Sequence, residues 1–305
     1  MAGTGTLSAS RALARSGRAP AWAVTAWRFA RTRPLGALGG LIVLGLVGMA
    51  LGADWIAPYT YDDTAARMHA PSRQFWMGTD NLGRDIWSRV VYGARISVTV
   101  GFATVALATL LAAAIGISSA YLGGAYDIAV QRLVDAWQSF PGLVIILSLM
   151  AVLGPGLLNL ILALSILGAA GASRVIRGAT LSVMQHPYIE AARAMGAGHL
   201  RIVLRHIVPN VLATIIVLAT IGLGTVILVE SALSFLGFGV PPPYPSWGGM
   251  VSGSGRSFMY HAPWMVLCPG AAISVAVFGF NMFGDALRDL LDPRLRGSGR
   301  SSALI

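Results

Sequence analysis

Residues 186–210, HPYIEAARAMGAGHLRIVLRHIVPN, place side chains able to do chemistry between two apolar runs. The segment holds histidines, arginines and one carboxylate, Glu190. Such groups can bind metals or transfer protons. No cysteine and histidine cluster in the sequence has the spacing of a zinc site, however, and no set of catalytic side chains gathers at one depth. The pattern therefore favours a role in contact rather than in catalysis.

The segment is predicted to form two short helices. Pro187 suits the first turn of a helix, where its missing N–H is no loss. An apolar face follows at i, i+3, i+4 and i+7, formed by Tyr188, Ala191, Ala192 and Met195, with Glu190 and Arg193 on the other side. Gly196 and Gly198 can end this helix. A second helix is expected to begin near His199 and to run toward Pro209.

A helix of about nine residues is roughly 13 Å long and is not stable alone in water. It must be held by something else. Its small-residue face suits insertion into a groove on a partner protein. An amphipathic segment lying on the membrane surface is the alternative, and the residues alone favour neither.

The composition indicates a protein that crosses a membrane several times. Of the 305 residues, 55% are hydrophobic and only 11% are charged, which excludes an ordinary soluble domain. The net charge of +10 could suggest nucleic acid. The basic residues are all arginine and lie at the edges of apolar runs, where membrane proteins keep cytoplasmic charge, so no nucleic-acid partner is expected. The single cysteine, Cys268, cannot form an internal disulfide.

Six transmembrane spans are predicted from runs of roughly 20 apolar residues. Gly154-Pro155-Gly156 divides one long uncharged run into two of these spans. The third span must then begin near Gln131, which draws Arg132 and Asp135 into its inner end as a local pair. The predicted runs are 35–53, 96–125, 131–153, 157–173, 207–229 and a stretch within 263–284.

The arginines set the predicted orientation. The first 34 residues hold six arginines and no acid, so the N-terminus is expected inside, and six spans place the C-terminus and residues 174–205 inside as well. The predicted divisions are a cytoplasmic tail (1–34), a first helix (35–57), an extracytoplasmic segment (58–94), a core with five spans (95–292) and a cytoplasmic tail (293–305). A mitochondrial transit peptide has a similar arginine-rich start and is the alternative.

Glu230 is the only acid deep within a predicted span. Such residues are candidates for a translocation path or gate. Hydrogen bonds to the backbone, or a pair with Arg95 at the same level, would instead give it a structural role. His261 and Cys268 alone make no metal site. Residues 54–94 are expected to form a small cap that either contacts a partner or seals the outer gate.

Three stretches together resemble one known family. EAARAMG with the later IVPN is similar to the EAA loop of bacterial ATP-binding-cassette importer permeases, with Gly196 six and Pro209 nineteen residues after Glu190. His206 stands where the general pattern has isoleucine. Residues 78–97, GTDNLGRDIWSRVVYGARIS, and 230–250, ESALSFLGFGVPPPYPSWGGM, are similar to hallmarks of the DppC/OppC type of dipeptide and oligopeptide permease, shared by nickel-importer permeases.

This resemblance implies an all-α, six-helix type I importer permease of the MetI-like fold in the bacterial cell membrane, in contact with lipid. It implies a second homologous permease, two cytoplasmic ATPase subunits and an extracytoplasmic substrate-binding protein as partners. It places the ATPase contacts at Glu190, Ala191, Ala192, Arg193, Gly196 and Ala197. The chain has no lysine and no P-loop, so ATP and Mg are expected in the partner subunits and no cofactor here.

Short peptides are the expected cargo, and nickel or another small solute is the alternative. A path for bare nickel would be expected to carry histidine, cysteine or carboxylate ligands along the spans. Only Glu230, Cys268 and His261 occur in or near the apolar runs, well separated in sequence. A secondary transporter would be expected to show inverted repeats and more buried ionisable groups, and neither is evident.

Overall fold

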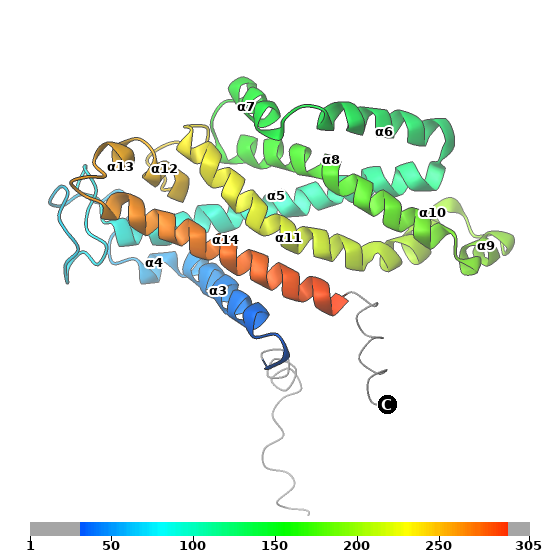
Figure 1. Cartoon of the computed structure of the whole chain (residues 1–305), viewed down its shortest axis with the longest axis horizontal. Coiled ribbons are helices and arrows are strands. Elements are labelled where there is room, and N and C mark those ends of the chain that lie inside the picture. The colour runs from blue at the N-terminus through cyan, green and yellow to red at the C-terminus, as the bar shows by residue number, and fades with distance from the viewer. Residues whose placement is uncertain (1–30, 292–305) are drawn as a thin grey trace, which may run out of the picture.

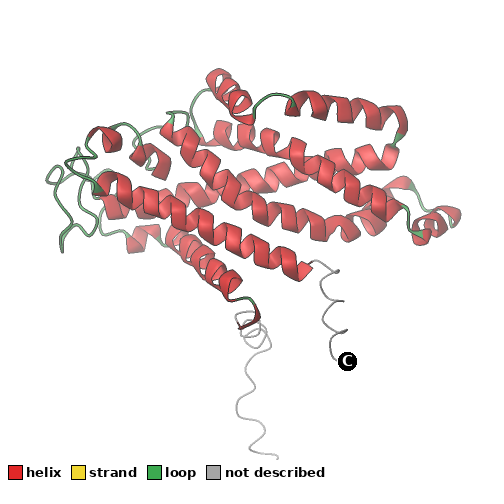
Figure 2. Ribbon diagram, in the orientation of Figure 1, coloured by secondary structure: helices red, strands yellow, loops and turns green. Residues whose placement is uncertain are grey.

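The computed structural model describes residues 31–291, and within that range every regular element is a helix (Figures 1 and 2). Five helices in the described range are long and apolar enough to cross a membrane. They are α3 (Pro34–Leu51), α5 (Ile86–Leu122), α8 (Leu157–Met184), the continuous helix His199–Phe235 and α14 (Trp264–Leu291). The predicted arginine-rich start and the tail 293–305 lie outside the described residues, apart from Arg31 and Arg33.

The predicted third span is broken into two helices. α6 (Gly124–Gln138) and α7 (Gly142–Leu153) meet at 89°. The prediction of one continuous helix beginning near Gln131 was therefore wrong, because the chain bends sharply after Gln138. The cause is Pro141, since the residue before a proline avoids the helical region and Pro141 itself is extended, with ψ 127°. The 12 residues of α7 span roughly 18 Å, less than the hydrocarbon core of roughly 30 Å.

α5 is the longest helix that is unbroken by a π-turn, with 37 residues. It begins ten residues before the predicted span because Asp85 caps it, accepting a hydrogen bond from the Ser88 amide at 2.8 Å. Figure 1 shows α5 crossing the bundle beside α8. This contact is close because a Cβ at Gly116 would lie 2.5 Å from the Ser173 carbonyl oxygen. At roughly 55 Å, α5 is longer than the hydrocarbon core.

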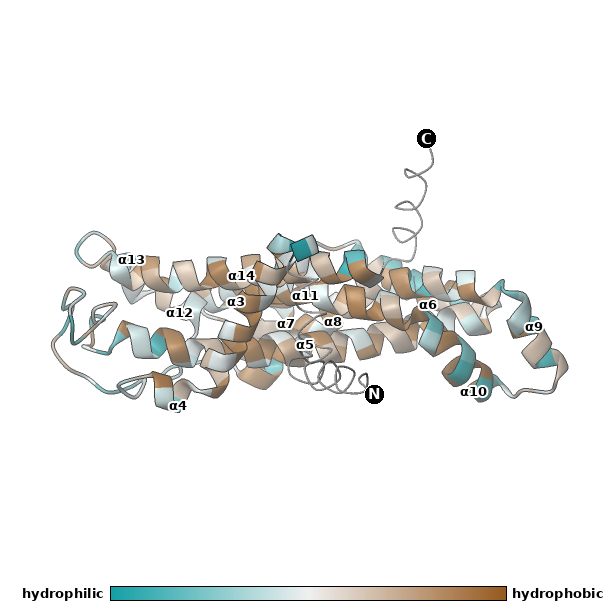
Figure 3. Ribbon diagram, turned by 90° about the horizontal axis from the view of Figure 1, so that it is seen from below, coloured by the Kyte–Doolittle hydropathy of each residue, from teal (hydrophilic) through white to brown (hydrophobic). Residues whose placement is uncertain are grey.

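α14 packs between α3 and α11 (Val208–Phe235) on the other side of the bundle. Glycines allow this approach: a Cβ at Gly279 would lie 2.4 Å from Cγ2 of Ile42. Many large apolar side chains face outward, among them Leu44 and Leu110, each 69% exposed. Figure 3 shows such hydrophobic residues along the length of the helices. An outward apolar surface of this extent is what a lipid environment favours.

The two ends of the bundle differ. One end carries the cap, which we define as residues 57–85 and 236–263, including α12 (Trp247–Val251) and α13 (Ser254–Ser257). The Trp247 indole donates to the Val90 carbonyl at 2.9 Å, and the Trp264 indole donates to the Thr79 carbonyl at 3.1 Å. These bonds seat the cap on α5 and α14. The opposite end carries α9 (Pro187–Ala194), and we call it the α9 end.

Candidate coupling site at the α9 end

α9 begins and ends where the sequence indicates. Pro187 occupies the first turn, the helix ends at Ala194, and Gly196 follows with φ 79°, a conformation that favours glycine. The second predicted helix is not short, however. α10 (His199–Ile202) continues through a π-turn (Val203–Ile207) into α11, giving a single 37-residue helix. Pro209 closely follows the π-turn, and this break in the regular α-helical hydrogen bonding accommodates its missing N–H.

The predicted apolar face of α9 is divided between the interior and the surface. Ala192 is 4% exposed and points inward together with Ile189, which is fully buried. Ile189 belongs to the buried cluster that includes Ile202 and Ile207. The predicted apolar face, which starts at Tyr188, does not include Ile189. The two buried residues of α9, Ile189 and Ala192, follow the i, i+3 spacing from Ile189 instead.

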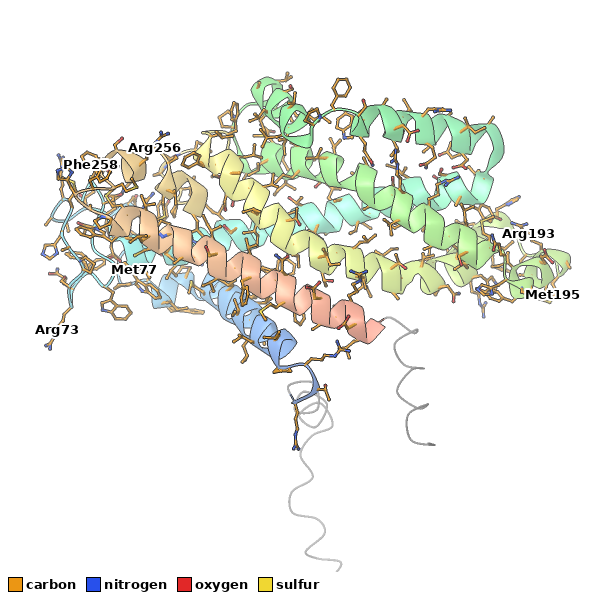
Figure 4. The ribbon with its side chains drawn as sticks, viewed as in Figure 1. Arg73, Met77, Arg193, Met195, Arg256 and Phe258 are labelled. Atoms are coloured by element: carbon orange, nitrogen blue, oxygen red, sulfur yellow. The ribbon has the colours of Figure 1, made fainter. Side chains whose placement is uncertain are left out.

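The outward face of α9 is apolar and largely exposed. Tyr188 is 40% exposed and Met195 is 81% exposed, and Ala191 between them is also exposed. Glu190 and Arg193 are exposed on the adjoining side. In Figure 4, Arg193 and Met195 lie at the far end of the molecule from the cap. A short helix with such a face can fit into a groove on another protein.

Aromatic contacts hold α9 against the bundle. The Tyr121 hydroxyl, at the end of α5, lies 2.8 Å from Nδ1 of His199, and the Arg193 guanidinium lies 5.9 Å from the centre of the Tyr121 ring. The His186 ring stacks on Tyr188 at 5.4 Å. Tyr121 therefore touches both sides of the loop that joins α9 to α10. No sequence pattern indicates Tyr121, because it lies 78 residues from His199 along the chain.

Glu230 is fully buried near the cap end of α11. The Ser234 hydroxyl donates to its carboxylate at 2.8 Å and the Ser231 hydroxyl does so at 3.3 Å. The pair with Arg95, one of the two alternatives for a structural role of Glu230, is not formed. Arg95 instead donates to Asp54 at 2.9 Å and to the Ala50 carbonyl at 3.0 Å, and the Arg95 guanidinium lowers the pKa of Asp54.

Two ion pairs tie α6 to α8. Arg132 and Asp135 form the predicted local pair at 4.0 Å, and Asp135 also accepts from Arg174 of α8. Asp127 accepts from Arg177 through both of its carboxylate oxygens. Among residues 31–291, no group of three or more His, Cys, Asp or Glu side chains is placed to hold a metal ion.

Comparison with known proteins identifies the family. The model of the binding-protein-dependent transport system inner membrane component matches residues 112–297, and that of the N-terminal transmembrane domain of oligopeptide transport permease C matches residues 22–76. The chain belongs to this permease family. α9, α8 and α11 all lie within the first match.

Several relatives resemble this permease over most of its length. It is 40% identical over 280 residues to a dipeptide transport system permease protein DppC of Alkalihalophilus pseudofirmus, covering 90% of this chain and 92% of the relative. It is 39% identical over 274 residues to the glutathione transport system permease protein GsiD of Escherichia coli, covering 89% and 90%. A putative peptide transport permease of Brucella suis is 40% identical over 278 residues, covering 90% and 93%.

The fold matches a solved importer. The inward-facing MetNI methionine ABC transporter aligns with a TM-score of 0.54 at 19% identity, covering 68% of this permease and 97% of that chain. The MetI-like, all-α fold is thereby confirmed. The permease is a multi-pass membrane subunit of a binding-protein-dependent ABC importer, and it works with ATPase, permease and binding-protein components. It is a transport subunit, because ATP hydrolysis in such importers is carried out by separate subunits.

Proposed function

We propose that this permease pairs with a second, homologous permease to form the path by which short peptides enter a bacterial cell. A substrate-binding protein delivers the peptide, and two ATPase subunits, which bind ATP and Mg, drive the transfer. The observation that carries the cargo assignment is the similarity, over about nine-tenths of the chain, to relatives whose names specify dipeptide, peptide or glutathione transport.

We propose that α9 is the coupling helix. Tyr188, Ala191 and Met195 would enter the ATPase groove, since they form its exposed apolar face. Glu190 and Arg193 would contact the rim of that groove. Gly196 and Ala197 would let the partner approach the turn closely, because neither carries a large side chain. Ala192 is buried, so it would support the helix from beneath rather than act as a direct contact.

The orientation follows from the same assignment. α9 and both termini would lie in the cytoplasm, where the ATPases are, and the cap would face the outside, where the binding protein docks. The distribution of arginine supports this arrangement, because residues 174–205 hold five arginines and one acid. Glu230, buried near the cap end of α11, would lie close to the outer gate.

The experiment is uptake by cells that lack the gene for this chain. Labelled di- to pentapeptides and labelled nickel are measured in parallel, with and without a plasmid copy of the gene. Lost peptide uptake that the plasmid restores, with nickel uptake unchanged, is expected. Unchanged peptide uptake with lost nickel uptake would replace the peptide assignment by nickel transport.

A further inference from the structure

The two stretches 78–97 and 230–250 meet at one cavity. The cavity has a volume of about 460 Å³ and lies at the cap end of the bundle. The first stretch contributes Asp80, Arg84 and Arg89, and the second contributes Ser234, Tyr244 and Ser246. Neither stretch has a part in the coupling contact at α9. The volume falls within the range of small-molecule sites, roughly 300–1,000 Å³.

The charged residues that line the cavity leave an excess of positive charge. They are Asp80, Arg84 and Arg89, so two guanidinium groups face one carboxylate. Arg84 donates through Nε to Asp80 at 2.7 Å. The Arg89 side chain approaches Asp80 only to 4.0 Å, and its one hydrogen bond within the described residues runs from Nη1 to the Tyr61 carbonyl at 2.7 Å.

Arg89 has a large unused capacity to donate. A guanidinium carries five N–H donors in a planar fork, and this fork matches the two oxygens of a carboxylate. The Arg89 side chain is only 8% exposed. Burying a cation with few hydrogen bonds is costly, so an anion that entered the cavity would gain a strong partner and would relieve that cost.

The other walls of the cavity are uncharged. Gly239 packs against Ser234 so closely that a Cβ there would lie 2.0 Å from the serine hydroxyl. Pro155, before α8, and Met265, in the first turn of α14, also line the cavity. The cavity therefore adjoins the cap-end termini of four spans, α5, α8, α11 and α14. Hydroxyl groups and neutral walls suit a peptide backbone with varied side chains.

We propose that this cavity binds the free C-terminal carboxylate of the peptide, with Arg89 as the main donor and Arg84 as the second. The proposal rests on the proposed function, because it gives the permease its own recognition of substrates that the binding protein delivers. Peptides with a blocked C-terminus would lack this contact. Recognition at this point would favour free peptides over amidated ones.

The test is uptake by proteoliposomes that hold the complete importer with its binding protein. One labelled peptide is supplied in two forms, the free acid and the C-terminal amide. The Arg89→Gln variant is expected to lower free-acid uptake on the order of tenfold and to leave amide uptake nearly unchanged, because a charge-assisted bidentate contact is lost. The Arg89→Lys variant keeps the charge but not the planar fork of donors. Its free-acid uptake should lie between that of the wild type and that of Arg89→Gln. The binding protein is the same in every sample. A change in the ratio of free-acid uptake to amide uptake therefore reports on the permease.

Further variants keep the outcome decisive if Arg89→Gln does not assemble. Arg84→Gln removes the second donor. It should lower the ratio of free-acid uptake to amide uptake less than Arg89→Gln does. Arg73→Gln is the control, since Arg73 is exposed at the tip of the cap and does not line the cavity (Figure 4). Equal losses for both peptide forms would overturn the proposal and favour a contact with the binding protein. An unchanged ratio in Arg89→Gln and Arg84→Gln would also overturn it, while leaving peptide transport in place.

If wild-type uptake of the amide is too low to measure, crosslinking gives the same decision. A peptide with a photoreactive group beside its free carboxylate should label the cap, and Arg89→Gln should lose most of that labelling. Unchanged labelling would contradict the proposal. Failure of the wild-type importer to take up either peptide form would instead contradict the proposed function.

Discussion

The hydroxyl of Tyr121 lies 2.8 Å from Nδ1 of His199, and this contact joins the end of α5 to the first residue of α10. α5 begins at the cap and ends one residue after Tyr121. The same tyrosine ring lies beneath the Arg193 guanidinium. We therefore expect a movement of α9 to be passed to α5, which crosses the whole bundle.

The Tyr121→Phe variant tests this link. It removes the hydrogen bond, worth about 1 kcal/mol, and keeps the ring beneath Arg193. We expect a several-fold fall in peptide transport per ATP hydrolysed, with normal assembly of the importer. Tyr121→Ala, which removes both contacts, should reduce the ratio further. Transport and ATP hydrolysis measured on the same proteoliposomes give the ratio, and an unchanged ratio in both variants would exclude the link.

Ala191→Arg places a large charge on the outward face of α9. We expect transport to be lost and the ATPase subunits to co-purify poorly, because a groove that fits alanine cannot take arginine. The permease itself should remain in the membrane at its normal level, since Ala191 is exposed. Ala191→Ser is the matched control and should behave nearly as the wild type.

Ala192→Arg gives the complementary result. Ala192 is 4% exposed, so an arginine there must displace the atoms that bury it. Overpacking of this kind costs about 1–3 kcal/mol or more. We expect a reduced amount of permease in the membrane, measured by immunoblotting. Normal transport by Ala191→Arg would contradict the assignment of α9 as the coupling helix.

Features set by neighbouring residues were predictable from the sequence. Pro187 and Gly196 mark the bounds of α9 because proline at a first turn and glycine at positive φ obey local backbone rules. The helix start after residues 78–85 follows from the Asp85 cap. Pro141 carried the same kind of signal, and the broken third span could have been inferred from it.

Features set by contacts between distant residues were not predictable. Arg95 had two acids at a similar level, and periodicity does not distinguish Asp54 on a neighbouring element from Glu230. The helix face of α9 that packs inward depends on where α8 and α11 lie, which the loop sequence does not contain. The cavity between residues 78–97 and 230–250 likewise requires the chain to be folded.

Membrane orientation can be tested with single cysteines in a Cys268→Ser background. Met195 and Tyr260 suit this purpose because they are 81% and 88% exposed at opposite ends of the bundle. An impermeant thiol reagent applied to intact cells should label Tyr260→Cys, and it should label Met195→Cys only after the membrane is opened. Labelling of Met195→Cys in intact cells would reverse the proposed orientation.

The ion pair between Asp127 and Arg177 should stabilise the corner of α5, α6 and α8. Arg177 donates to both carboxylate oxygens, and the Ser119 hydroxyl of α5 donates to the same carboxylate. The two side chains are only 16% and 30% exposed, so each variant, Asp127→Asn or Arg177→Gln, leaves a poorly solvated partner. We expect each to lower the free energy of unfolding by roughly 1–3 kcal/mol.

A double-mutant cycle separates the pair from its surroundings. The double variant should be less destabilised than the sum of the single variants by about 1–2 kcal/mol, because the second substitution no longer breaks an intact pair. Arg132→Gln is the control: the Arg132 side chain is 81% exposed in its pair with Asp135, so a change below about 0.5 kcal/mol is expected. Thermal unfolding of the purified permease in detergent supplies the values. Fully additive losses would show that Asp127 and Arg177 stabilise this corner independently, despite their shared hydrogen bonds.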